Sequence, residues 1–264
     1  MAKTAPYTLK KSLGQHFLKD DSVCLRIMEA LNGTEFSQLI EVGPGGGALT
    51  KHLLQLQGKD FKAVELDDEK VAYLETTFPQ LKDKIIHQDF LEIDVPFEGP
   101  FTIIGNFPYN ISSQILFKAL DWKDQVECLV GMFQKEVAQR VAAPPGSKVY
   151  GVTSVLVQAY FSVEYLFDVP PESFTPPPKV VSGVIKMLPK KPFGTNDGVN
   201  ETPDMKSEKQ FKNLVKTAFN QRRKQLRNGV KGLFSEKVLR DEIFTKRAEQ
   251  LSIDDFARLT FKMN

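Results

Sequence analysis

Two apolar periodicities alternate along residues 38–133. Short runs rich in β-branched and aromatic residues are typical of buried strands, and they are separated by stretches with the three-to-four-residue repeat of a core-facing helix. The expected strands are residues 39–42, 61–66, 84–87, 101–105 and 126–133, and the expected helices are residues 48–57, 68–78 and 112–120. This order predicts an α/β fold with a Rossmann-like, parallel sheet and crossover helices.

Two further strands are expected at 160–167 and 180–188, on either side of the proline-rich stretch FTPPPK. Their connection is too short for a crossover helix, so we expect an antiparallel arrangement. The simplest architecture is a mostly parallel sheet with one antiparallel strand.

The chain changes character after residue 189. Residues 190–204 are rich in Pro, Gly and Asn without periodicity, which is typical of a linker. Apolar residues then recur at helical spacing from Phe211 to Phe219 and again in 235–244, 247–251 and 253–261. We therefore predict a catalytic domain at 1–189 with a basic arm at 1–19, a linker at 190–204, and a small all-α domain at 205–264.

Charge follows the same division. The chain has a formal charge of +2, yet residues 1–189 carry 18 basic and 23 acidic groups, whereas residues 190–264 carry 17 and 10. Between Lys209 and Lys231 there are eight basic residues and no acidic one, among them Arg222, Arg223, Lys224 and Arg227. With the basic arm (Lys3, Lys10, Lys11 and Lys19), this asymmetry favours a polyanion as partner, with RNA held through its phosphates.

Other composition features exclude several classes. No apolar run has membrane-spanning length, and the first residues lack a signal-peptide core. Cys24 and Cys128 show no metal-ligand spacing, so we expect buried, reduced thiols and no metal. We expect a cytoplasmic monomer with no membrane partner.

The segment LIEVGPGGGALT places a glycine turn between a strand and a helix. Gly43, Gly45 and Gly47 would let the backbone turn sharply and approach a ligand. Glu65 lies at the end of the second strand, where a carboxylate can accept the hydroxyls of a ribose, and Asp89 follows the third, where it can accept from an adenine amino group. This pattern fits either S-adenosylmethionine or a dinucleotide.

The fourth strand ends in Asn106-Phe107-Pro108-Tyr109, which favours methylation of an exocyclic amino group. An adenine amino nitrogen is a poor nucleophile because its lone pair is delocalised into the ring. The Asn106 side-chain oxygen and the Phe107 carbonyl could accept its two hydrogens, while Pro108 fixes the backbone. Tyr109 offers a stacking face for the base, and Phe174 is a candidate for a second face. The target adenine would be flipped out or already unpaired.

Five motifs in order resemble the 16S ribosomal RNA adenine dimethyltransferase family over nearly the whole chain: SLGQHFL, EVGPGGGALT, NFPY, SFTPPPKVVS and FNQRRKQLRN. The resemblance implies a class I methyltransferase that dimethylates two adjacent adenosines in the 3′-terminal hairpin loop of 16S RNA, in the small (30S) subunit or an assembly intermediate. It also implies that S-adenosylmethionine is contacted by these residues: His16, Leu18, Gly43, Glu65, Asp89 and Asn106. The chain has His16 and Phe107 where the family usually has Asn and Leu.

Three other functions remain open at this point. A macrolide-resistance-type methylase of large-subunit RNA shares the cofactor and tetrad pattern, but the N-terminal motif and the basic C-terminal signature argue against it. A mainly non-catalytic ribosome-assembly factor would not need an intact tetrad. A dinucleotide-dependent oxidoreductase would leave both NFPY and the basic segment unexplained.

Overall fold

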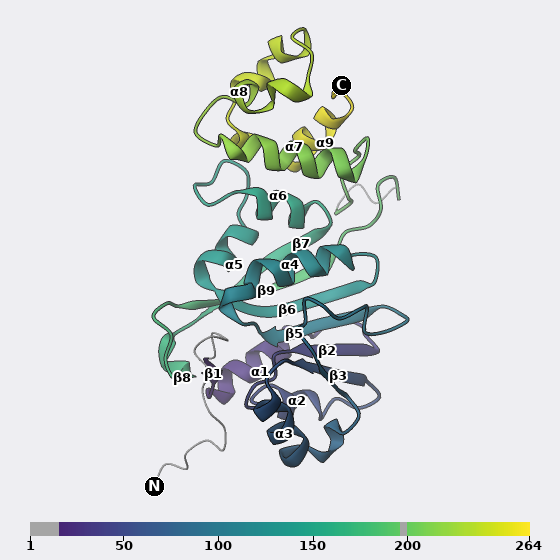
Figure 1. Ribbon diagram of the computed structural model, residues 1–264, viewed down its shortest axis with the longest axis vertical. Helices are drawn as coiled ribbons and strands as arrows, with labels where there is room; N and C mark the ends of the chain where they lie inside the picture. The colour runs from purple at the N-terminus through teal and green to yellow at the C-terminus, as the bar shows by residue number, and fades with distance from the viewer. Residues whose placement is uncertain (1–15, 196–199) are drawn as a thin grey trace. The chain divides into compact units, whose positions relative to one another are not determined.

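The computed structural model of the protein describes residues 16–195 and 200–264. Its main element is a seven-stranded sheet in the order β4-β3-β2-β5-β6-β9-β7 (Figure 1). The strands are β2 (Gln38–Val42), β3 (Asp60–Glu65), β4 (Ile85–His87), β5 (Phe101–Asn106), β6 (Val126–Gln134), β7 (Phe161–Val169) and β9 (Ser182–Pro189).

The pairing of the strands confirms the predicted α/β fold. The pairs from β4 through β6 are parallel, whereas β9 is antiparallel to β6. The five expected parallel strands begin and end within one residue of the observed ones. Residues of β2, β5 and β6 are buried almost throughout, as expected where helices cover both faces of a parallel sheet.

Helices of the first part of the chain pack against this sheet. They are α1 (Asp21–Glu29), α2 (Thr50–Leu53), α3 (Asp68–Thr77) and α4 (Ser112–Asp121), and a fifth helix, α5 (Lys135–Val141), follows β6 in the chain. Apolar residues of α1, α2 and α3, such as Ile27, Leu53 and Leu74, share one core with alternate residues of the strands. A two-stranded antiparallel pair, β1 (Phe17–Leu18) with β8 (Phe174–Thr175), and helix α1 were not predicted from the sequence.

The chain divides into two compact units whose limits differ from the predicted domains. The first unit comprises Met1–Ala138 and Glu164–Pro189, and the second comprises Gln139–Val163 and Lys190–Asn264. The segment 139–163, which the sequence analysis assigned to the first domain, therefore belongs to the second unit. Within it, the ring of Tyr150 lies 6.1 Å from that of Phe219, so aromatic packing joins this segment to the C-terminal helices.

The second unit contains α6 (Val152–Gln158), α7 (Glu208–Asn220), α8 (Leu226–Val230) and α9 (Ile253–Thr260). The expected apolar stripe on α7 is buried: Phe211, Leu214, Val215 and Ala218. Residues 235–251 form short 3₁₀ turns in place of the expected longer helices, because Asp241 and Lys246 adopt extended backbone and interrupt them. In the predicted linker, the Lys191 amide donates to the Asn200 carbonyl (3.0 Å).

None of the helices in residues 16–195 and 200–264 combines the length and apolar character that crossing a bilayer requires. Cys24 and Cys128 are free and buried, as expected.

Candidate active site

A pocket opens at the carboxyl ends of β2, β3 and β5, where an open α/β sheet places its ligand. Ten of the residues singled out in the sequence line it: His16, Leu18, Gly43, Gly45, Glu65, Asp89, Asn106, Phe107, Pro108 and Tyr109. The structure thus brings together motifs that are spread over more than 90 positions of the chain.

The glycine turn after β2 forms one wall of the pocket. Gly43 and Gly45 have φ angles of +68° and +54°, in the left-handed region that favours glycine. A Cβ atom on Gly45 would lie 2.8 Å from the ring of Phe17, which itself lines the pocket. A side chain at Gly45 would therefore have to displace part of the wall.

Glu65 at the end of β3 is held by three backbone N–H groups. Its carboxylate accepts from Gly45 at 3.1 Å, from Leu66 at 2.9 Å and from Asp67 at 3.0 Å. Burial raises the pKa of this carboxyl, while the three donors favour the ionised form. The carboxylate is therefore oriented by the same glycine turn that shapes the pocket.

Asp89 lies beyond β4 and is half-buried. One of its oxygens accepts from the Leu91 amide at 2.9 Å. Asp89 lines the pocket, and its contact with an adenine amino group stays a prediction.

The tetrad continues from the end of β5. The Asn106 amide nitrogen donates to the His16 carbonyl at 3.1 Å, so the side-chain oxygen is the atom that remains to accept a hydrogen. The Phe107 ring is buried, 4.9 Å from the ring of Phe133, and occupies the space where a Cβ on Gly131 would be. The ring at Phe107 thus packs within the fold, so the replacement of the family's usual leucine changes the packing here and not the main-chain carbonyl group.

Tyr109 is anchored at its hydroxyl. The oxygen lies 2.5 Å from the Ser182 hydroxyl on β9, and burial raises the pKa of the phenol. The ring lies 5.6 Å from that of His16, measured between centroids.

The structure corrects the expectation for Phe174. Its side chain is only 1% exposed and belongs to the hydrophobic core around Leu18 and Val184. It pairs through β8 with Leu18 on β1 and does not line the pocket. A ring enclosed in the core cannot offer a face to a base, so Phe174 acts here as a packing anchor.

Sequence reasoning missed Glu41, which lines the same pocket. Glu41 is 2% exposed, and its carboxylate accepts from the Thr50 hydroxyl at 2.7 Å. Burial raises the pKa of this carboxyl to about 8. The available signal was its place directly before the glycine turn, as the penultimate residue of β2.

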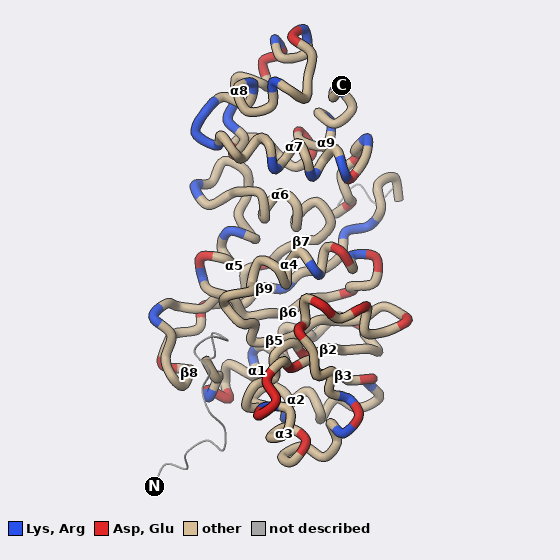
Figure 2. Tube along the Cα trace, viewed as in Figure 1, with Lys and Arg blue, Asp and Glu red and all other residues tan. Residues whose placement is uncertain are grey.

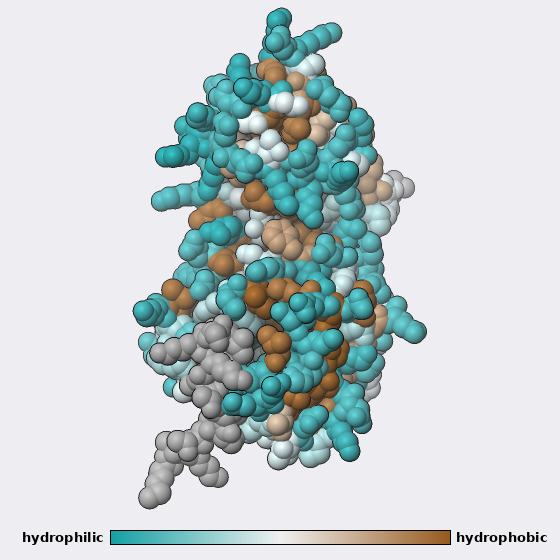
Figure 3. Space-filling view, in the orientation of Figure 1, coloured by the Kyte–Doolittle hydropathy of each residue, from teal (hydrophilic) through white to brown (hydrophobic). Residues whose placement is uncertain are grey.

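The basic C-terminal segment runs from α7 through a turn into α8. Arg222, Arg223 and Lys224 lie in the turn between α7 and α8. Arg222 donates to the Glu249 carboxylate at 2.6 Å and also to the Lys148 carbonyl. Arg223 and Lys224 are exposed, whereas Arg227 is half-buried. Figure 2 shows this basic turn in blue beside α8, and Figure 3 shows a mostly hydrophilic surface there.

Only part of the N-terminal motif and of the basic arm lies within the described residues. His16, Phe17, Leu18 and Lys19 are described, whereas residues 12–15 of SLGQHFL and Lys3, Lys10 and Lys11 lie outside the described residues.

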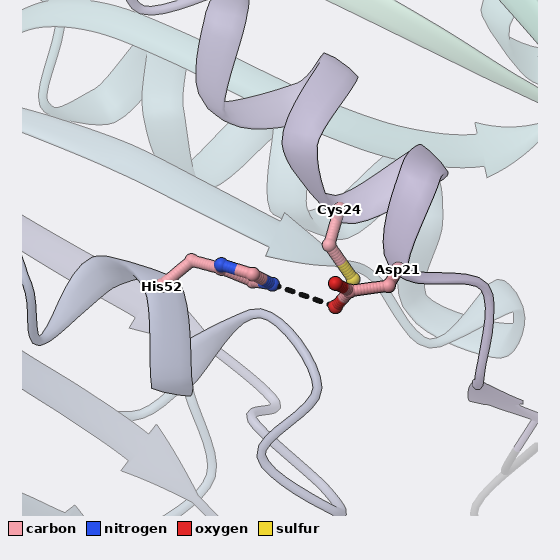
Figure 4. Close-up of side chains that lie close together, drawn as sticks. All are labelled: Asp21, Cys24 and His52. Atoms are coloured by element: carbon pink, nitrogen blue, oxygen red, sulfur yellow. Dashed lines mark hydrogen bonds and ion pairs between the residues drawn. The ribbon is translucent and has the colours of Figure 1, made fainter.

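Asp21, Cys24 and His52 bring three potential metal ligands within 4.8 Å of one another (Figure 4). Asp21 is already bonded to His52 at 2.8 Å and to Lys51 at 2.6 Å. Burial raises the pKa of the Cys24 thiol to about 11, which disfavours the thiolate that binds metal. We interpret the cluster as an ionic contact between α1 and α2.

Comparisons with known proteins identify the family of this chain. Residues 7–262 match the model of the family described as ribosomal RNA adenine dimethylase. Ribosomal RNA small subunit methyltransferase A of Parabacteroides distasonis is 52% identical over 255 residues, covering 95% of this chain and 92% of the relative.

Two solved structures have a similar fold. A dimethyladenosine transferase from Plasmodium falciparum superposes with a TM-score of 0.75 at 25% identity, covering 92% of this chain and 96% of the other. The 23S rRNA methyltransferase ErmE superposes with a TM-score of 0.72 at 19% identity, covering 94% of this chain and 99% of the other. This likeness shows a shared fold. By the family match and its relatives, this chain belongs to the ribosomal RNA adenine dimethylase family.

Proposed function

We propose that the protein uses S-adenosyl-L-methionine to dimethylate the exocyclic amino groups of two adjacent adenosines in the 3′-terminal hairpin loop of 16S rRNA, during ribosome biogenesis. The observation that carries the proposal is the fixed Asn106 amide. Its nitrogen is engaged by the His16 carbonyl, so its oxygen is the acceptor left at the pocket.

The pocket fits the cofactor. Glu65 is placed to accept the ribose hydroxyls, Asp89 to accept from the adenine amino group, and Gly43 and Gly45 to let the backbone approach. When bound, the cofactor supplies a methyl group on a positively charged sulfur.

The tetrad would activate the target nitrogen. The Asn106 oxygen and the Phe107 carbonyl accept the two amino hydrogens and favour a pyramidal nitrogen, whose lone pair is then free to bond the methyl carbon. Transfer would break the bond between the methyl carbon and the sulfur, and the nitrogen would release one proton to solvent. No covalent enzyme nucleophile is needed, so alignment supplies most of the rate.

For the RNA, we propose contacts from Arg223 and Lys224, the exposed basic residues of the α7–α8 turn, with Arg222 and Arg227 beside them. The partner would be the small subunit or an assembly intermediate, and the protein a cytoplasmic monomer. We further propose that the first unit binds the cofactor and that the second carries this RNA contact.

The fold of ErmE is compatible with the large-subunit alternative, but a likeness at 19% identity does not indicate which RNA is the substrate. The small-subunit relative is 52% identical along nearly the whole chain. A mainly non-catalytic assembly factor would not require the oriented Asn106 amide.

Transfer of labelled methyl groups to ribosomal subunits tests the proposal. Small subunits that lack the two dimethyladenosines should accept label, whereas Asn106→Ala should lower kcat by about 100- to 1000-fold with little change in subunit binding. Asn32→Ala, an exposed turn residue, is the matched control and should remain active. Label on large-subunit RNA instead would move the assignment to the alternative.

A further inference from the structure

His16 links three parts of the candidate site. Its main-chain carbonyl accepts from the Asn106 amide at 3.1 Å. Its ring nitrogen Nδ1 lies 2.9 Å from the Pro176 carbonyl in the FTPPPK stretch. Its ring also lies against that of Tyr109, with centroids 5.6 Å apart and planes inclined by 30°. His16, which directly precedes β1, thus contacts both the first and the last residue of the tetrad.

Among residues 16–195 and 200–264, the His16 ring forms one hydrogen bond, the one to Pro176. Because the Pro176 oxygen can only accept, Nδ1 carries the proton in this bond. The bond is exposed to solvent, where a hydrogen bond contributes little net stability. The ring can therefore move at small cost, whereas the carbonyl that orients Asn106 belongs to the main chain.

The burial of Phe174 leaves the second face of the base clamp unassigned. Among described residues, His16 is the aromatic residue in ring contact with Tyr109. A base stacked between two rings needs them about 7 Å apart, twice the usual contact distance of about 3.5 Å. The observed 5.6 Å is shorter, so the His16 ring fills part of the space that a base would enter.

We propose that His16 supplies the second ring of the base clamp. In the free protein its ring rests against Tyr109, and on RNA binding it gives up the Pro176 bond, moves outward and stacks on the flipped adenine. This inference rests on the proposed function and assigns a substrate-contacting side chain at a position that otherwise holds an asparagine in the family. The asparagine could keep the main-chain contact to Asn106 but offers no aromatic face.

Side-chain variants separate the ring from the main-chain contact. In His16→Ala and His16→Asn the carbonyl to Asn106 remains, and in His16→Phe the ring remains while the Pro176 bond is lost. Methyl transfer to unmethylated small subunits should fall about 10- to 100-fold in kcat/KM for His16→Ala and His16→Asn, and stay within about threefold of wild type for His16→Phe. Phe193→Ala, at a residue that is 60% exposed, is the control for loss of an aromatic ring elsewhere.

Two further measurements identify the cause. The Kd of S-adenosylmethionine should be unchanged in all three variants, because the inference places the ring on the RNA base. In small subunits reconstituted with 2-aminopurine at one target position, the bound base should be brighter with His16→Ala than with wild type, since one stacking partner is gone.

Equal kcat/KM for wild type and His16→Ala would overturn the inference, and so would a loss in His16→Phe as large as in His16→Ala. A weakened cofactor Kd in His16→Ala with unchanged 2-aminopurine emission would place the ring on the cofactor instead. The proposed function fails separately, if the wild-type protein transfers no label to small subunits.

Discussion

The two ends of the pocket are held in different ways. At the cofactor end, Glu65 is bound by three backbone N–H groups, and Gly43 and Gly45 have no side chains to rearrange. At the base end, the Tyr109 hydroxyl contacts Ser182, and among the described residues the His16 ring forms one hydrogen bond, the exposed one to Pro176. Under the proposed function, this difference predicts a cofactor half that is formed before binding and a base half that adjusts to its substrate.

The cofactor half should tolerate substitutions least. Gly45→Ala adds a Cβ 2.8 Å from the Phe17 ring at a residue with positive φ, so the wall must shift. We expect kcat/KM to fall by about 100-fold, because a displacement of about 1 Å in a positioning element has an effect of this size. Steady-state methyl transfer measures kcat/KM, and isothermal titration with S-adenosylmethionine measures the affinity for the cofactor.

Gly58→Ala is the matched control for the glycine prediction. Gly58 also has positive φ, +69°, but a Cβ there meets nothing within 4 Å. Both variants should lose about 1 kcal/mol of folding stability from backbone strain. Comparable losses of activity in the two would show that strain, and not the Phe17 clash, explains the effect.

Substitutions at Tyr109 in the base half should lower activity by different amounts. Tyr109→Ala removes the stacking face and should lower kcat/KM by about 10- to 100-fold. Tyr109→Phe keeps the face and loses only the Ser182 contact, so a decrease of about threefold to tenfold is expected. If both variants lose the same activity, the hydroxyl contact matters and the ring does not, and the distinction between the two halves would need revision.

Glu41 offers a pH test of the fixed half. Its pKa is about 8 in the folded protein because of burial, against 4.5 for an ordinary glutamate. The folded state therefore holds a proton that the unfolded state releases, so unfolding free energy should decrease as pH rises from about 5 to 8. The size should be on the order of 1 to 2 kcal/mol, since relaxation reduces such penalties.

Urea unfolding at pH 5, 6.5 and 8 measures this effect. Glu41→Gln keeps an oxygen that can accept from Thr50 but cannot ionise, so its stability should vary much less with pH. Glu29→Gln, at an exposed residue of α1, is the control and should follow the wild type. The same slope in wild type and Glu41→Gln would assign the dependence to other groups.

The sheet could be predicted because its signal is local. Each parallel strand is a short apolar run covered on both faces, and the turn after β2 is marked by glycines whose positive φ values the structure requires. Local signals also placed Glu65, Asp89 and the tetrad, since Glu65 and the first residue of the tetrad lie at strand ends and Asp89 lies two residues beyond one. Their roles toward ligands stay predictions.

What the sequence could not provide depends on contacts between distant positions. Phe174 looked available beside its prolines, but its burial depends on the pairing of β8 with β1, more than 150 positions away. Residues 139–163 carry no compositional mark of their place in the second unit. The raised pKa of Glu41 likewise arises from the whole core around it, and not from its neighbours in the chain.

Smaller effects are expected in the basic turn, where the contrast between fixed and free side chains recurs. Arg222 is engaged by Glu249 and Lys148, whereas Arg223 and Lys224 are exposed. Replacing Arg223 and Lys224 together by Gln should weaken subunit binding severalfold and reduce the dependence of log K on log salt by about 2, one for each lost phosphate contact.

Arg222→Gln should change that salt dependence by less than 1, because its charge is already paired with Glu249. It should instead lower the unfolding free energy by up to about 1 kcal/mol, the usual range for a partly exposed ion pair. Filter binding between 50 and 300 mM salt and urea unfolding separate the two effects. A larger salt effect from Arg222 than from Arg223 with Lys224 would mean that RNA displaces Glu249, which would make this pair an adjustable element like the base end of the pocket.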